Sequence, residues 1–262
     1  MQKGMRYGES ETLVVPAFVK LAKNAQGRAK LLDEIAWYRA VRGLRVPDVI
    51  NWNPLTLANV FGRPAEPSDA PAIIDALREF HAVTMVNGDP TEMIRYELYH
   101  KVKTRYELTG VPAQIKTVNG VELPRFEDAL EFMRTVKIPK SHLCIIHGDP
   151  HLGNVLMDDG PVFIDPRGRF GGKQLYGVPE YDFAKVHLSL TGYSDLEQCE
   201  PIPVTNHMTI PFRIHTGAFA MTPLTKLLLA SIWLANAPGF SDHRWAISHY
   251  YALYIFKITC SH

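Results

Sequence analysis

The sequence predicts an α+β protein with two unequal lobes, a small β-rich lobe followed by a larger, mostly helical one. Apolar, β-branched runs over residues 12–20 and 48–60 indicate strands near the start of the chain. From residue 68 onward, apolar residues recur mainly at helical spacing. One hairpin signal, Asp159-Gly160 between short apolar runs, interrupts this helical part. These patterns place most strands in the first lobe and most helices in the second.

The first lobe is expected to hold strands around one helix. Residues 12–20 predict two short strands or one bent edge strand, because Pro16 interrupts the run. Helical spacing of apolar residues predicts a helix over 29–41. A strand, a proline turn and a second strand over 55–60 follow.

A Gly-Pro break at residues 62–64 marks the expected domain boundary. It separates an N-terminal lobe, residues 1–63, from a helical lobe, residues 64–262. In the second lobe we expect helices, one strand and the hairpin, over 68–86, 92–108, 125–136, 143–147 (strand), 154–165 (hairpin) and several stretches beyond Tyr181.

Composition narrows the class of protein. With 28 basic and 27 acidic residues the chain has a net charge of +1, so we expect no nucleic-acid partner. The longest apolar stretch, residues 227–237, is too short for a membrane span, so we expect no membrane partner. Three widely spaced cysteines and a start without an apolar leader favour the cytoplasm. The oligomeric state is left open.

The chemistry-bearing stretch is His147-Gly-Asp-Pro-His-Leu-Gly-Asn154, followed by the hairpin and by Ile164-Asp165-Pro-Arg-Gly168. A hairpin brings its ends together, so Asn154 and Asp165 should lie close in space. Amide and carboxylate oxygens suit Mg²⁺, which takes one or two carboxylates plus substrate phosphates. Asp149 is then free to accept a proton from an attacking hydroxyl, and phosphoryl transfer needs this division of labour.

Three motifs in one order, HGDPHLGN, IDPRG and PEYDFAKV, carry a family resemblance. The sequence resembles the aminoglycoside phosphotransferase and choline kinase group of the protein-kinase-like superfamily over residues 12–255. The resemblance implies a protein-kinase-like two-lobe fold and a small-molecule hydroxyl as acceptor. It also implies Mg²⁺ as cofactor and ATP as donor, with GTP as the other nucleotide to consider.

The resemblance assigns residues to the nucleotide. It implies a strand lysine on the phosphates and a helix glutamate that pairs with it, and Lys20 and Glu34 occur in that order. The strand over 55–60 becomes the hinge, whose backbone receives the adenine at Ala58, Asn59 and Val60. Only 19 residues precede Lys20, so the N-lobe is either minimal or truncated, and its phosphate loop must come from residues 4–10.

The remaining assignments lie around the loop. Asp182 is expected to brace the catalytic loop as a buried acid, and His147 to hold it through hydrogen bonds. His151 is expected to be structural or near the phosphates. Arg167 either contacts phosphate or substrate, since a guanidinium suits anionic oxygens, or pairs with a nearby carboxylate.

The acceptor is expected to be sugar-like. The segment around IDPRG and the LSLTG tail look most like kinases associated with bacterial capsule and surface-carbohydrate loci. Beyond Phe183 acidic residues are sparse, which disfavours a polycationic aminoglycoside. An aromatic cluster near the C-terminus is expected to be core, its alternative being a cage for a quaternary ammonium. The cluster comprises Trp233, Trp245, Tyr250, Tyr251 and Tyr254.

Three alternative hypotheses about the function remain open. The acceptor is alternatively an aminoglycoside or a choline-like amino alcohol. The short start before Lys20 motivates a catalytically weak nucleotide-binding module. His147 and His151 with Asp165 are also consistent with a zinc-dependent hydrolase.

Overall fold

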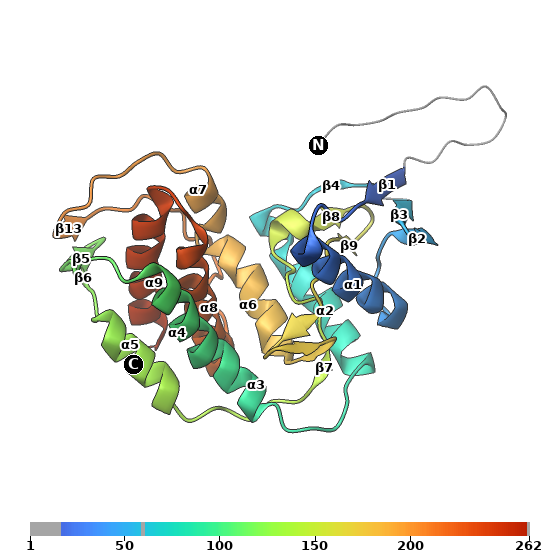
Figure 1. Ribbon diagram of the computed structural model, residues 1–262, viewed down its shortest axis with the longest axis horizontal. Coiled ribbons are helices and arrows are strands. Elements are labelled where there is room, and N and C mark those ends of the chain that lie inside the picture. Colours follow the sequence, from blue (N-terminus) through green and yellow to red (C-terminus); the bar gives the residue numbers. More distant parts are fainter. Residues whose placement is uncertain (1–16, 59–60, 261–262) are drawn as a thin grey trace.

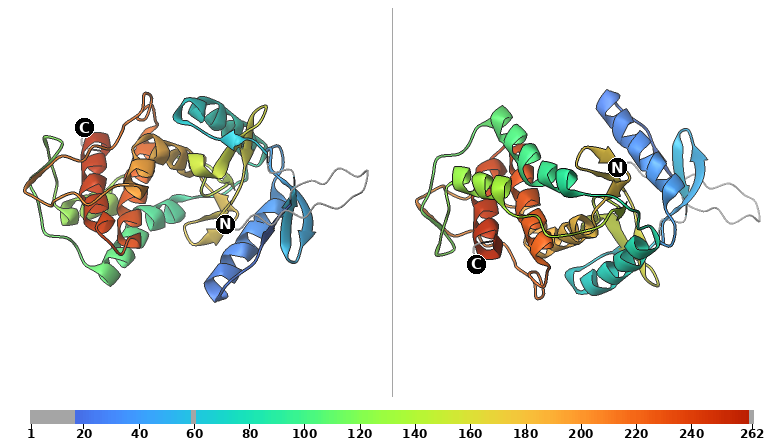
Figure 2. Two further views of the ribbon diagram at one scale, coloured as in Figure 1. Left: turned by 90° about the horizontal axis from the view of Figure 1, so that it is seen from above. Right: turned by 90° about the horizontal axis from the view of Figure 1, so that it is seen from below.

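The computed structural model describes residues 17–58 and 61–260 and has two unequal parts (Figure 1). A small sheet and helix α1 lie near the start of the chain, and a helical part holds its end. Two further views show the same division (Figure 2). The expected α+β class is confirmed. None of the described helices is long and apolar enough to cross a membrane.

The small lobe is a three-stranded antiparallel sheet packed against one helix. Strands β1 (Ala17–Lys20), β3 (Leu55–Ala58) and β2 (Asp48–Trp52) lie in the order β1-β3-β2, with Lys20 opposite Leu55. Helix α1 spans Ala25–Ala40 and starts earlier than predicted, because the Asn24 side chain caps it by accepting from the Gly27 N–H at 2.8 Å. The expected strand residues 12–16 and phosphate loop 4–10 lie outside the described residues.

One buried tryptophan ties the small lobe to the catalytic loop. Trp37 of α1 packs with Leu55, Leu57 and Phe80 in a common apolar cluster. Its indole N–H donates to the Ile146 carbonyl oxygen at 2.7 Å, immediately before the loop. The position of α1 relative to the loop is therefore fixed by apolar packing and by a buried hydrogen bond.

The expected break after the small lobe is itself a strand. Strand β4 (Arg63–Pro64) pairs with β8 (Val155–Met157), which pairs with β9 (Pro161–Phe163). The hairpin that was expected over 154–165 is confirmed. The strands pair up to Met157 and Pro161, and two residues of the short turn between them, Asp159 and Gly160, have positive φ, as is common in tight hairpin turns.

The second lobe is mostly helical, as expected. Helices α3, a π-helical turn and α4 follow one another without a break where one helix over 92–108 was predicted. The helical segments are η1 (Pro67–Asp69), α2 (Ala70–Val83), α3 (Thr91–Arg95), the π turn (Tyr96–His100), α4 (Lys101–Thr109), α5 (Phe126–Thr135), η3 (Leu152–Asn154), α6 (Pro179–Leu190), α7 (Tyr193–Glu197), α8 (Pro223–Asn236), η4 (Ala237–Gly239) and α9 (Arg244–Cys260).

Short strand pairs complete this lobe. A two-residue strand in the run over 143–147 leads into the catalytic loop, as the sequence predicted. The strands are β5 (Thr117–Val118), β6 (Val121–Glu122), β7 (Cys144–Ile145), β10 (Arg169–Phe170), β11 (Lys173–Gln174), β12 (Tyr176–Gly177) and β13 (His207–Met208).

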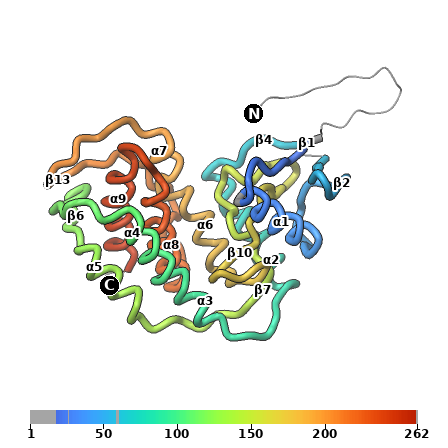
Figure 3. Tube along the Cα trace, viewed as in Figure 1, coloured from blue at the N-terminus to red at the C-terminus, as the bar shows by residue number. Residues whose placement is uncertain are grey.

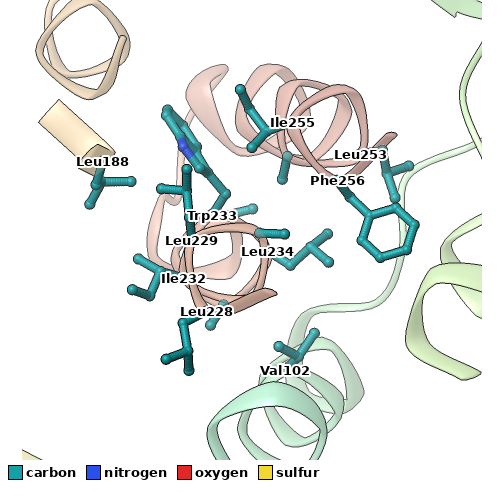
Figure 4. Close-up of a cluster of buried hydrophobic side chains, with 14 of the residues drawn as sticks. Val102, Leu188, Leu228, Leu229, Ile232, Trp233, Leu234, Leu253, Ile255 and Phe256 are labelled. Carbon is teal, nitrogen blue, oxygen red and sulfur yellow. The ribbon is translucent and has the colours of Figure 1, made fainter. Parts of the chain in front are cut away.

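The main core lies between α8 and α9, which pack side by side (Figure 4). Trp233, Tyr250 and Tyr251 are buried there, so these members of the aromatic cluster are core. Helix α6 packs on α8 and also on α2, and the chain trace shows it between the helical pair and the small lobe (Figure 3). One helix thus connects the core to the catalytic loop.

Candidate active site

Asp149 is a buried carboxylate on the loop that follows β7. Its side chain is 5% exposed, and each of its two oxygens contacts a cation. Oδ1 lies 3.0 Å from Lys185 Nζ, and Oδ2 lies 2.8 Å from Arg167 Nε. Burial by itself raises the pKa of Asp149, but the charges of Lys185 and Arg167 outweigh burial and hold this pKa well below its ordinary value. Asp149 is therefore ionised at neutral pH.

Asp182 of α6 holds the loop by accepting hydrogen bonds from its backbone. Its Oδ2 accepts the backbone N–H of His147 at 2.8 Å, and its Oδ1 accepts that of Gly148 at 2.7 Å. Oδ2 also lies 3.0 Å from His81 Nε2. Gly148 has a φ of +83°, and a Cβ there would lie 2.9 Å from the Gly168 nitrogen. The first turn of the loop therefore needs both the buried carboxylate and a glycine.

His147 is neutral and locked in one tautomer. Its Nε2 lies 3.0 Å from the Ile164 carbonyl oxygen, which can only accept, and its Nδ1 accepts the Asp149 N–H at 3.3 Å. Burial lowers the pKa of His147 to about 4. Both ring nitrogens are occupied within the protein, so His147 has no lone pair for zinc. In the part of the chain that the structure describes, no three His, Cys, Asp or Glu side chains gather as a metal site.

The hairpin brings Asn154 beside the segment that carries Asp165. The Ile164 N–H donates to the Asn154 carbonyl oxygen at 3.0 Å, directly before Asp165. The Asn154 side-chain amide donates to the Asp149 carbonyl oxygen at 2.9 Å, which fixes the side chain over the loop. The spacing argument that put these residues together therefore agrees with the backbone pairing.

Lys20 bridges the two lobes. Its Nζ lies 2.5 Å from Glu34 Oε1 and also contacts Asp165 Oδ1. Burial lowers the pKa of Lys20, but the negative charges of Glu34 and Asp165 outweigh burial and raise it. Burial also raises the pKa of Glu34. The order of strand lysine and helix glutamate is thus matched by direct contact.

The donor set beside Lys20 fits Mg²⁺. A carboxylate at Asp165 and an amide at Asn154 are oxygen ligands of the kind that Mg²⁺ accepts, with substrate phosphates and water completing the shell. The hydroxyl of Tyr38, one helical turn after Glu34, is buried near the carboxylates of Glu34 and Asp165, and it has no hydrogen-bond partner among the described residues. Burial and the charges of Glu34 and Asp165 raise the pKa of Tyr38, so it remains a neutral donor.

The other predicted residues have mixed outcomes. Ala58 ends β3 and is buried, whereas Asn59 and Val60 lie outside the described residues. The His151 Nδ1 accepts the Gly153 N–H at 3.2 Å and caps η3, and burial lowers the pKa of His151. Arg167 pairs with a nearby carboxylate, which was one of its two expected roles.

Lys185 is a site residue that sequence reasoning missed. It lies on α6, three residues after Asp182, and its side chain is only 7% exposed. Ser189, a further four residues along, accepts the Leu152 N–H at 3.0 Å. The three polar residues thus share one face of α6 and bind successive parts of the loop. The available signal was a lysine three residues after Asp182, the acid that was expected to brace the loop.

A two-lobe fold with a buried loop aspartate, and with a second carboxylate that contacts a strand lysine, is typical of a kinase-like phosphotransferase. The pattern of the Phosphotransferase enzyme family matches residues 8–198, and the chain belongs to that family. It is therefore a small-molecule phosphotransferase that acts on a hydroxyl group, and the resemblance that the motifs carry is confirmed.

A solved structure of a kinase shares this fold. A putative fructosamine-3-kinase from Thermobifida fusca matches with a TM-score of 0.51 at 20% identity, over 92% of this chain and 86% of that chain. A choline kinase from Cryptosporidium parvum matches with a TM-score of 0.48 at 10% identity, over 93% and 81%. Among curated proteins, none is significantly similar in sequence to this chain.

Proposed function

We propose that the protein transfers the γ-phosphoryl group of ATP to a hydroxyl of a sugar-like acceptor, with Mg²⁺ as cofactor. The observation that carries the proposal is the placement of Asp149, buried and ionised, five residues before Asn154 on a loop that also adjoins Asp165. Asn154 and Asp165 would hold the metal, and Mg²⁺ supplies charge neutralisation at the phosphates. Lys20, set by Glu34, would hold the phosphates themselves.

Asp149 acts chiefly by orienting the acceptor hydroxyl. Because its pKa is held low, it is a weak base and takes the proton only as the new bond forms. Transfer through a loose transition state needs little prior deprotonation, so positioning is the larger contribution. The acceptor oxygen bonds to the γ-phosphorus, the bond to the β-bridging oxygen breaks, and the hydroxyl proton moves to Asp149.

The charges around Asp149 favour a neutral acceptor over an amine. Lys185 and Arg167 both contact this carboxylate, so an ammonium group close to the reacting hydroxyl would be repelled. Trp233 and Tyr251, members of the candidate cage, are buried in the core and offer no open face to a quaternary ammonium. A sugar or polyol avoids this repulsion and can use its hydroxyls as hydrogen-bond partners.

The wider assignments follow from the same proposal. We assign residues 1–63 to nucleotide binding and residues 64–262 to the catalytic loop and acceptor. We also place the enzyme in the cytoplasm, where ATP is available. The three cysteines, Cys144, Cys199 and Cys260, are all free thiols, which is consistent with a reducing compartment.

Acceptor-dependent release of nucleoside diphosphate tests the function. Purified protein is incubated with Mg²⁺ and ATP or GTP and with matched panels of sugars, polyols, aminoglycosides and choline-like amino alcohols. We expect turnover with a sugar or polyol, and a loss of about 10²–10⁴-fold in the Asp149→Asn variant. If only the aminoglycosides or the choline-like amino alcohols are phosphorylated, the acceptor is an amine-bearing alcohol instead of a sugar. Nucleotide binding without any turnover above Asp149→Asn would identify a binding module instead.

A further inference from the structure

The two cations on Asp149 differ sharply in burial. Lys185 contacts Oδ1 and its side chain is 7% exposed, whereas Arg167 contacts Oδ2 and is 61% exposed. The two oxygens of this carboxylate therefore have different surroundings. One faces the interior at α6, and the other faces an exposed guanidinium.

Lys185 is fixed by the scaffold. Its ammonium lies 5.7 Å from the ring centroid of Tyr181, which is buried beside it on α6. Asp182 and Ser189, on the same face, hold backbone N–H groups of the loop before and after Asp149. The helix thus binds backbone and catalytic side chain together, and Lys185 is the part that reaches the carboxylate.

Arg167 has a different attachment. It follows the hairpin, two residues after Asp165, and its backbone N–H donates to the His147 carbonyl oxygen at 2.9 Å. Its backbone is held, but its side chain extends into solvent. Because this guanidinium is exposed, it can leave the buried carboxylate for solvent at a smaller cost than the buried Lys185 ammonium could.

We propose that Lys185 is a positioning residue that holds Oδ1, so that Oδ2 is presented to the acceptor hydroxyl, and that Arg167 occupies Oδ2 until the acceptor displaces it. This inference rests on the proposed function. A hydroxyl must approach a base to within about 2.6–3.2 Å, and only the oxygen on the exposed side allows that approach. The displaced guanidinium stays beside the reacting groups, where it suits anionic phosphate oxygens.

A double-mutant cycle tests the pairing without any acceptor. Free energies of unfolding are measured in urea for Lys185→Met, Asp149→Asn and the double variant. We expect strongly non-additive changes, with the double variant more stable than the sum predicts, because either single change leaves one buried group without its partner. Additive changes would overturn the assignment of Lys185, whatever the acceptor proves to be.

Kinetics test the positioning role. Lys185→Met is expected to lower kcat about 100-fold with little change in the KM for ATP, because a misplaced base costs about this much. Lys185→Arg should recover a large part of the loss, and Lys257→Met, at an exposed position on α9, is the matched control. Wild-type protein without acceptor turnover would refute the proposed function. A Lys185→Met kcat within threefold of wild type would refute this inference alone.

Chemical rescue separates position from folding. In Lys185→Ala, added propylammonium should restore part of kcat, and 1-propanol, its uncharged match, should not. Loss of activity that neither the amine nor Lys185→Arg restores would make the role structural. Arg167→Ala should lower the acceptor KM severalfold because a competitor is removed. A higher acceptor KM would show that Arg167 binds the acceptor rather than gives way to it.

Discussion

The two sides of the site are held by different means. Around Asp149, Asp182 and Lys185 the groups are almost fully buried, and most contacts are hydrogen bonds or ion pairs inside the protein. On the proposed nucleotide side, Lys20 is 28% and Asp165 52% exposed, Glu34 is 10% exposed, and ion pairs hold the three across the lobes. The buried side keeps its geometry without a ligand, whereas the exposed side depends on charges that a nucleotide and metal would rearrange.

This difference has an energetic consequence. Removing one partner of a buried charged network costs about 3–5 kcal/mol, whereas exposed ion pairs contribute about 0–1 kcal/mol. Changes on the loop side should therefore reduce stability and turnover together. Changes on the proposed nucleotide side should chiefly reduce ligand binding, with a smaller loss of stability.

The largest effect is expected from Asp182→Ala. The change leaves the His147 and Gly148 N–H groups buried without an acceptor, so we expect the free energy of unfolding to fall by about 3 kcal/mol or more. Urea unfolding followed by circular dichroism measures it. Asp195→Ala, a half-buried carboxylate on α7, is the comparison. Equal losses in the two variants would show that Asp182 contributes no more to the free energy of unfolding than a half-buried carboxylate elsewhere.

The nucleotide side should respond in binding. Lys20→Ala removes a proposed partner of the phosphates, so we expect nucleotide Kd to rise about 10–100-fold, with a smaller loss of unfolding free energy than in Asp182→Ala, because Lys20 is partly exposed. Isothermal titration calorimetry with Mg²⁺ and ATP measures the first quantity. Lys23→Ala, exposed nearby in the sequence, is the control. A collapse in stability would place Lys20 on the buried side of the comparison.

The predictability of the site follows the same division. Loop and hairpin spacing predicted Asp149, Asn154 and Asp165, and the family resemblance implied Lys20 and Glu34. The structure brings these five residues into contact or adjacency. The role of each remains a prediction.

The role of Lys185 was harder to predict from the sequence. A lysine on a helix ordinarily indicates a solvated face, and only tertiary packing shows that this face is covered by the loop. The two-residue strands, such as β10 and β11, escaped prediction for the same reason, since pairs that short are set by their surroundings.

Acid should lower the free energy of unfolding through the buried histidines. Burial lowers the pKa of His147 and of His249 to about 4, below the ordinary value near 6.5, so the unfolded chain binds protons more readily between these values. The free energy of unfolding should therefore fall as pH falls from about 6.5 toward 4, by at most about 1.4 kcal/mol per pH unit for each histidine.

His249 offers a check away from the site. It lies on α9, and its Nδ1 is 2.8 Å from the Tyr106 hydroxyl oxygen. His249→Gln keeps a polar group but cannot titrate, so urea unfolding at pH 7 and pH 5 should show a smaller pH dependence than wild type. An unchanged pH dependence would mean that His249 is not a source of acid sensitivity.

The smallest effect on stability is expected at Asp165, where loss of the Lys20 ion pair and relief of the backbone act in opposite directions. Its φ of +54° is in the left-handed region, which costs most non-glycine residues about 1–2 kcal/mol and Asp or Asn less. Asp165→Gly should therefore be more stable than Asp165→Asn by about 0.5–1 kcal/mol, since both lose the Lys20 pair but only glycine relieves the backbone. Both variants should lose the Mg²⁺ dependence of nucleotide binding. If Asp165→Asn were the more stable variant, the left-handed backbone at Asp165 would carry no strain.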